Sequence, residues 1–169
     1  MDFEIIVQEL VNSTEMIRAL LSGISQEDAR LKPNPESWSI LELLCHIYDE
    51  EREDFREHLG FILHPKDKGW HNIDPQSWVI ARKYNDQDFA EIREMFFKER
   101  RKSLDWLKGL SGESLDTAYT SEYGSMTAGE MLASWIAHDN LALRQLVELR
   151  RTRIENITGP YSIAYAGEW

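Results

Sequence analysis

The chain has 169 residues, of which 42% are hydrophobic, and its 30 acidic and 19 basic residues give a formal net charge of -11. A negative field of this size repels phosphate backbones and anionic membrane surfaces, so we expect neither a nucleic-acid nor a membrane partner. The length and the composition indicate a single globular domain that covers residues 1–169.

No stretch approaches the roughly 18 consecutive apolar residues of a transmembrane helix. The opening segment, MDFEIIVQEL, is acidic where a signal peptide is basic. Cys45 is the only cysteine, which excludes an intramolecular disulfide and a zinc cluster built from cysteines. We therefore expect a cytoplasmic protein.

Four segments carry apolar residues at steps of three and four, the period of an amphipathic helix. They cover residues 3–21, about 38–61, 86–110 and 127–153. Four such helices bury their apolar stripes most simply as an all-α four-helix bundle.

The segments between the predicted helices differ in length and composition. The connection of residues 63–85 can cross the full length of a helix and includes a short helical pattern near residues 76–82. The second and third long helices are therefore expected to run parallel, in an up-down-down-up order. Residues 111–125 have no strand pattern and are predicted to be a loop, and the aromatic tail, residues 158–169, is expected to pack back on the bundle.

Two helix starts have the spacing of a capping box, in which a serine or threonine precedes a glutamate by three residues. Ser39 pairs in this way with Glu42, and Thr127 pairs with Glu130. These pairs predict the first turns of the second and fourth long helices.

His138 lies on the apolar side of the fourth predicted helix, where it shares a face with Met131, Trp135, Ala142 and Gln145. Helical bundles build metal sites from inward-facing side chains, and a second histidine four residues away is a common partner. Ala142 stands at that position. His138 is therefore either a metal ligand or a core histidine that donates a ring proton to a backbone or carboxylate acceptor.

His46 lies away from the apolar centre of the second predicted helix, close to Glu42 and Asp49 on a helical wheel. Periodicity alone therefore assigns His46 to the surface. Glu50, four residues later, would be a carboxylate ligand beside it, although this spacing is also common on solvent-facing helices.

Polar residues continue the line of the apolar stripe farther along the same helix: Glu51, Asp54 and His58. Either the helix leaves the core there, which we expect, or these groups line a polar cavity. The basic cluster KERRK, residues 98–102, is interpreted as the solvated face of a helix. Cys45, set among leucines and isoleucine, is predicted to be a buried, unreactive thiol.

Two more histidines, His64 and His71, lie in the long connection. Each could reach over one end of the bundle as a further metal ligand, or it could be a solvated loop residue. No glycine-rich phosphate loop and no nucleophile elbow is present in the sequence.

Three segments resemble the DinB/YfiT-like superfamily, a group of bacterial four-helix-bundle proteins often described as metalloenzymes. They are ESWSILELLCHIYDEE, SMTAGEMLASWIAHDNLALRQL and the closing YAGEW. Members of this superfamily commonly bind a divalent ion through three histidines, one on the second helix and a His-x-x-x-His pair on the fourth. The resemblance implies that His46 and His138 are metal ligands, whereas Ala142 replaces the third histidine.

The third ligand is open. Glu50, His64 and His71 are the candidates, and zinc or nickel is the candidate ion. If none of them binds a metal, Ala142 instead leaves an apolar pocket beneath Trp135.

That pocket would also involve Met131, and Gln145, one turn beyond Ala142, would either contact a ligand or contribute to packing.

The resemblance implies a metal-dependent enzyme of the thiol-transferase or hydrolase type in a bacterial stress response. It would act on a small molecule, with a low-molecular-weight thiol such as bacillithiol or mycothiol as a partner, and it would form a homodimer. The alternative is a metal-free family member that acts as a small-molecule binding module or as a structural dimer.

Overall fold

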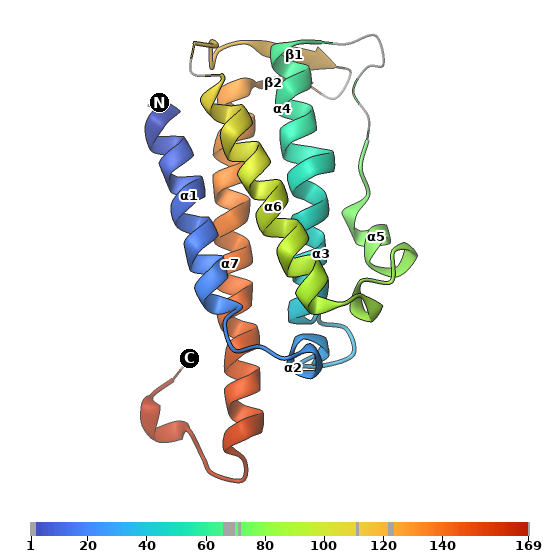
Figure 1. The fold of residues 1–169 in the computed structure, drawn as a ribbon, viewed down its shortest axis with the longest axis vertical. Coiled ribbons are helices and arrows are strands. Elements are labelled where there is room, and N and C mark those ends of the chain that lie inside the picture. Colours follow the sequence, from blue (N-terminus) through green and yellow to red (C-terminus); the bar gives the residue numbers. More distant parts are fainter. Residues whose placement is uncertain (1–2, 66–69, 71, 111, 122–123, 169) are drawn as a thin grey trace.

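The computed structural model of the protein describes residues 3–65, 70, 72–110, 112–121 and 124–168. All four predicted long segments are helical in it. The first is α1 Phe3–Leu20, the third is α6 Phe89–Lys108 and the fourth is α7 Ala128–Thr158. The second consists of α3 Ile40–Glu50, a π-helical turn, η1 Glu51–Phe55, and α4 Arg56–Leu63, which follow one another without a break. In Figure 1, α1 and α7 run downward, whereas the α3–α4 segment and α6 run upward.

Shorter elements occupy the connections. α2 Gln26–Arg30 precedes α3, and the predicted short helix of the long connection is α5 Pro75–Ala81, followed by a 3-10 turn, η2 Tyr84–Asp86. A second 3-10 turn, η3 Ala164–Ala166, lies in the tail.

The segment predicted to be a loop without strands contains a β-hairpin. β1 Ala118–Ser121 pairs antiparallel with β2 Gly124–Thr127 and lies across the upper end of the bundle in Figure 1. Each strand has only four residues and both are largely polar, so neither shows the longer alternation by which a strand is recognised in a sequence.

Both predicted capping boxes are present. Ser39 Oγ accepts from the backbone N–H of Glu42, whose carboxylate accepts from the N–H of Ser39. Thr127 and Glu130 form the same reciprocal pair at the start of α7. Each cap supplies partners for backbone donors that a helix N-terminus leaves unpaired.

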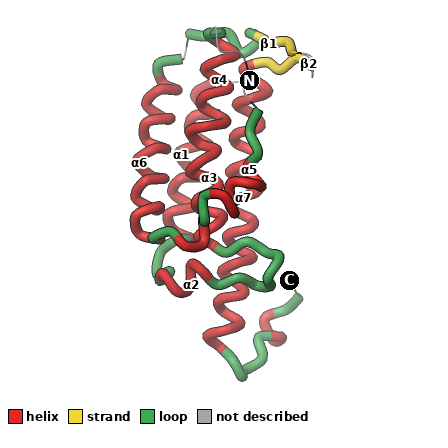
Figure 2. The backbone as a smooth tube through the Cα atoms, turned by 90° about the vertical axis from the view of Figure 1, so that its right-hand side faces the viewer, coloured by secondary structure: helices red, strands yellow, loops and turns green. Residues whose placement is uncertain are grey.

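The interior has two apolar clusters with a polar layer between them. The lower cluster includes Ile17 of α1 and Ala142 of α7, and the upper one includes Leu10 and Trp135 of the same two helices. The residues between these levels are polar on all four long helical segments, and they form the candidate site. Figure 2 shows the same helices side by side from a second direction.

The tail does not pack on the bundle as predicted. α7 extends below the other helices, and the tail turns back beside its protruding end (Figure 1). There Tyr161 and Tyr165 are exposed, while Ile163 lines a groove with Val147 and Ile154. Within the described part of the chain, no helix is both long and apolar enough to span a membrane.

Candidate metal centre

His46, Glu50 and His138 converge at the level of the polar layer. His138 Nε2 lies 2.8 Å from Glu50 Oε2 and 3.3 Å from His46 Nε2. The third edge of this triangle, from His46 Nε2 to Glu50 Oε2, is 3.5 Å. Three ligand atoms of the kinds that divalent ions bind are thus grouped on two helices, α3 and α7.

The triangle has the dimensions of one face of a tetrahedral metal site. Bonds of about 2.0–2.1 Å at tetrahedral angles place neighbouring ligand atoms about 3.3 Å apart. The His46–His138 and His46–Glu50 edges, 3.3 and 3.5 Å, are close to that length. The His138–Glu50 edge, 2.8 Å, has the length of a hydrogen bond and is somewhat shorter. The residues therefore fit a zinc-like ion with a small adjustment of Glu50.

The surface assignment of His46 is wrong, because only 8% of the residue is exposed. Ten of the eleven residues of α3 are buried, since the helix packs against α2, α5, α6, α7 and η2. A helix surrounded in this way has no solvent face for a helical wheel to identify. The ring of Trp38 packs edge-on against His46, with their centroids 4.8 Å apart.

His46 has its second ring nitrogen, Nδ1, buried without a hydrogen-bond partner among the described residues. Metal-binding histidines usually donate this second N–H to a carboxylate or carbonyl. Here the packing of Trp38 and His138 against the ring holds it instead.

Electrostatics distinguish the two histidines. Burial lowers the pKa of His46, despite the nearby carboxylate of Glu50. Burial also acts to lower the pKa of His138, but its hydrogen bond to Glu50 and the charges of Glu50 and Asp139 outweigh burial and raise it. His46 is therefore the histidine that loses its proton more readily, as a metal ligand must, whereas Glu50 stabilises the protonated form of His138.

The remaining candidates for a third ligand are not in this group. His64 lies at the C-terminal end of α4 with 61% of its side chain exposed, and its Nε2 is 3.6 Å from Glu113. His71 lies outside the described residues. Among the described candidates, Glu50 alone joins the two histidines.

A buried ion cluster lies directly beside the candidate centre. Arg100 of α6, with 1% exposed, binds Glu51 at 2.7 Å and Asp139 at 2.6 Å. Ser13 of α1 donates to Asp139, and Trp135 Nε1 donates to Glu51 at 3.2 Å. All four long helical segments are thus joined at this level.

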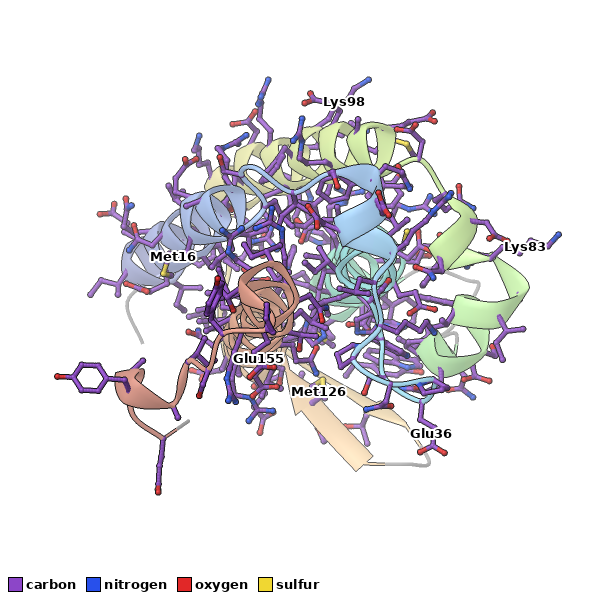
Figure 3. The ribbon with its side chains drawn as sticks, turned by 90° about the horizontal axis from the view of Figure 1, so that it is seen from below. Met16, Glu36, Lys83, Lys98, Met126 and Glu155 are labelled. Carbon is purple, nitrogen blue, oxygen red and sulfur yellow. The ribbon has the colours of Figure 1, made fainter. Side chains whose placement is uncertain are left out.

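Two sequence interpretations are corrected by this cluster. The second helix does not leave the core at Glu51, because Arg100 neutralises the buried carboxylate there. One to two turns later His58 is also buried, with 2% exposed, and pairs with Asp54. The KERRK cluster is not wholly solvated either. Lys98 points outward from α6 (Figure 3), whereas Arg100 points into the core.

The π-helical turn η1 starts at Glu51, immediately after the candidate ligand Glu50. A π-helical turn adds a residue to the helical repeat and is frequent at functional sites. Glu50 and Glu51 are both buried, one beside the histidines and the other beside Arg100.

The four residues predicted to line one pocket do not share a single one. Trp135 is fully buried in the upper apolar cluster, and Ala142 in the lower one. Met131 lines a cavity near the hairpin, and Gln145 lines a cleft of about 600 Å³ with Trp38. Ala142 follows His138 by one turn of α7.

Cys45 is buried, as predicted. The residue is 2% exposed, and burial, reinforced by the charges of Asp49 and Glu42, raises its pKa to about 12. Its Sγ lies 3.8 Å from the carbonyl oxygen of Tyr84.

The fold and the site define a helical-bundle protein with a largely buried cluster of two histidines and one carboxylate, in which His46 and Glu50 are buried and His138 is partly exposed. The chain belongs to the DinB superfamily, whose sequence model matches residues 9–146. The structure is similar to YfiT from Bacillus subtilis, described as a probable metal-dependent hydrolase with an unusual four-helix bundle topology. The TM-score is 0.75 and the sequence identity 11%, over 88% of this chain and 86% of that chain, a likeness that shows the fold. No curated protein matches the chain.

Proposed function

We propose that this protein is a metal-dependent hydrolase of small molecules that binds a divalent ion, zinc or nickel, through His46, Glu50 and His138. The observation that carries the proposal is the triangle of their ligand atoms, with edges of 2.8, 3.3 and 3.5 Å. Two histidines and one glutamate are a ligand set of hydrolytic zinc sites, which keep a fourth position open for water. The description of YfiT as a probable metal-dependent hydrolase supports the same class.

The residues of this chain have distinct parts in such a reaction. His46 and His138 would each present a neutral Nε2, and Glu50 would supply the negative charge that offsets part of the charge of the ion. A bound divalent ion supplies an activated water molecule at neutral pH. Ala142, 2% exposed, leaves the side where the family's third histidine would stand without a competing ligand.

A low-molecular-weight thiol could occupy the same open position, which would make the protein a thiol transferase. The absence of a ligand side chain at Ala142 is compatible with either nucleophile. Assays with and without added thiol separate the two reactions, because a hydrolase needs water alone.

The experiment that tests the proposal is metal analysis of protein purified without a polyhistidine tag, followed by zinc and nickel titration. We expect one ion per chain, lost in His46→Ala, Glu50→Ala and His138→Ala. Glu57→Ala, which removes an exposed carboxylate from α4, is the matched control and should keep the ion. No ion and no tight uptake would overturn the metalloenzyme and favour the metal-free binding module.

We also propose a homodimer that uses the protruding end of α7. Ile154 and Ile157 are 40% and 59% exposed there, and Tyr161 and Tyr165 of the tail that follows α7 are exposed as well. Exposed apolar side chains grouped in this way are typical of protein–protein contacts. Light scattering should give twice the chain mass, and Ile157→Glu should reduce it to one chain; a monomeric wild-type protein would refute the dimer.

A further inference from the structure

A cavity of about 440 Å³ lies one helical turn from the candidate metal centre on both helices that carry its ligands. Asp54, four residues after Glu50, and Ser134, four residues before His138, both line it. Residues four apart on an α-helix lie on the same face, as Ser134 and His138 do on α7, and Phe55 of the π-helical turn lines the cavity and packs against the ring of His138. The cavity therefore continues the face that carries the centre, toward the hairpin end of the bundle.

Phe55 connects the cavity to the centre. Its side chain lines the cavity, and its ring centroid is 5.2 Å from that of His138. The same ring stacks on Trp135 at 5.6 Å with an angle of 11° between the planes. A molecule in the cavity would thus be separated from His138 only by an aromatic ring that is fixed by stacking.

The outer walls come from segments outside the bundle. Trp70 and Ile73 belong to the long connection, and Met126 belongs to β2 and is labelled in Figure 3. Trp70 stacks on Tyr119 of β1 with centroids 5.6 Å apart, and Phe61 packs edge-on against both rings. These contacts hold the aromatic wall in place without a ligand.

The charged group of the cavity is built into this wall. Asp54 Oδ1 lies 2.6 Å from His58 Nδ1, and the ring of His58 is stacked under Trp70 at a centroid distance of 4.0 Å. His58 is 2% exposed, whereas 17% of the Asp54 side chain remains accessible. The buried histidine thus orients a carboxylate whose accessible part faces the cavity.

The remaining lining is apolar or neutral. Trp70, Ile73, Met126 and Met131 are joined by the small polar side chains of Asn72 and Ser134, and no lysine or arginine is present among the described lining residues. A carboxylate in apolar surroundings favours a cation that brings its own hydrogen-bond donors. The overall charge of -11 further favours cationic ligands over anionic ones.

We propose that this cavity is a binding pocket for a small molecule with an apolar or aromatic body and a primary amine. The ammonium group donates to Asp54, and the body lies against Trp70 and the two methionines. The volume is in the lower part of the range for ligand pockets, roughly 300–1,000 Å³, which restricts the body to a single ring or a short aliphatic chain. The preference for an amine rests on the cavity itself and does not require the proposed metal centre.

The test uses three probes of nearly equal shape and different charge: benzylamine, benzyl alcohol and benzoate. Their dissociation constants are measured by NMR titration of the full chain with EDTA present, so that none binds through a metal ion. We expect benzylamine to bind at least about tenfold more tightly than benzyl alcohol, as a charge-assisted hydrogen bond predicts, and benzoate to bind most weakly.

Two variants identify the cavity as the place of binding. Asp54→Asn should remove the preference for benzylamine over benzyl alcohol, and Met126→Trp, which fills the cavity from β2, should weaken both. Asp105→Asn is the matched control, because it removes an exposed carboxylate of α6 that pairs with Lys108 and leaves the cavity unchanged. Equal binding of the amine and the alcohol, or a preference that survives Asp54→Asn, would overturn the inference.

A zinc titration of the same proteins separates this inference from the proposed function. Wild-type protein that binds zinc but shows no preference for benzylamine would refute the pocket and leave the metal centre intact. An amine preference that depends on Asp54, in protein that takes up no zinc, would refute the metalloenzyme and support the pocket as a binding site for amines.

Discussion

Arg100 donates two hydrogen bonds to Asp139, from Nη1 at 2.6 Å and from Nη2 at 2.8 Å. Both residues lie in the core, and each of the two is 1% exposed. The same guanidinium binds Glu51. Asp139 directly follows the candidate ligand His138 on α7, and Glu51 directly follows Glu50 on α3. One side chain of α6 therefore fixes the spacing between the two helices that carry the candidate centre.

Removal of this guanidinium should be severely destabilising. Arg100→Ala leaves two carboxylates buried without a counter-charge, so we expect a loss of about 3–5 kcal/mol in the free energy of unfolding. Urea denaturation followed by circular dichroism measures it. Arg101→Ala, the exposed neighbour, should change stability by no more than about 0.5 kcal/mol. Similar values for the two variants would show that the buried cluster contributes little to stability.

Ala142 lies one helical turn from His138 on the same side of α7, so a histidine placed there should act as an additional ligand. We expect Ala142→His to bind zinc at least about tenfold more tightly than the wild type, since a fourth protein ligand closes the site. The larger side chain should also cost about 1–3 kcal/mol of stability, because Ala142 is buried.

Isothermal titration with zinc, using a competing chelator, measures this affinity. Ala137→His adds a histidine on an exposed position of the same helix and should leave zinc affinity unchanged. If Ala142→His folds and binds zinc no more tightly than the wild type, Ala142 does not face the centre.

Zinc affinity should fall as the pH drops through neutrality. A histidine binds zinc only after it loses its proton, and the pKa of His138 is raised by Glu50, beyond what burial takes away. As the pH falls, protons therefore begin to compete with zinc for His138 at a higher pH than for an ordinary histidine. Because the pKa of His46 is lowered, protons compete with zinc for His46 only at a lower pH. Below the pKa of His138 we expect a loss of about tenfold per pH unit.

NMR titration of the metal-free protein provides an independent measure. His138 should titrate above the ordinary histidine value and His46 below it. Glu50→Gln removes the charge that raises the pKa of His138, so its titration should move to lower pH. An unshifted His138 in this variant would mean that Glu50 is not its partner in solution.

The long helices and their caps could be predicted because they depend on local sequence. Apolar residues at helical spacing mark the buried stripes, and the Ser39–Glu42 and Thr127–Glu130 pairs mark helix starts that need no tertiary contact.

The polar layer could not be predicted in the same way. The sequence predicts His46 on the surface and Glu51 where the helix leaves the core, because a helical wheel contains no information about neighbouring helices. Their burial depends on Arg100 and His138, which lie about 50 and 90 positions away along the chain. The π-helical turn at Glu51 also shifts the repeat on which the wheel depends. Family resemblance selected His46 and His138, but their convergence with Glu50 required the three-dimensional arrangement.

Cys45 should resist thiol reagents in the folded protein. Burial, with the charges of Asp49 and Glu42, raises its pKa to about 12, so almost no thiolate exists at pH 8. We expect no reaction with Ellman's reagent in buffer and prompt reaction of one thiol per chain in concentrated urea. Fast labelling of the folded protein would show that the thiol is accessible.

The same shift makes stability depend on pH in alkaline solution. The folded-state pKa of about 12 lies above the value of 9.0 for an unperturbed thiol, so the folded protein holds this proton more tightly than the unfolded chain does. The stabilising contribution is complete below pH 9 and is lost as the pH rises toward 12. Tyr84 adds to the loss, because burial and its hydrogen bond to Asp49 raise its pKa as well. Urea denaturation between pH 8 and pH 11 should show declining stability, with a shallower decline in Cys45→Ala; an equal slope in that variant would assign the decline to Tyr84 and to other groups.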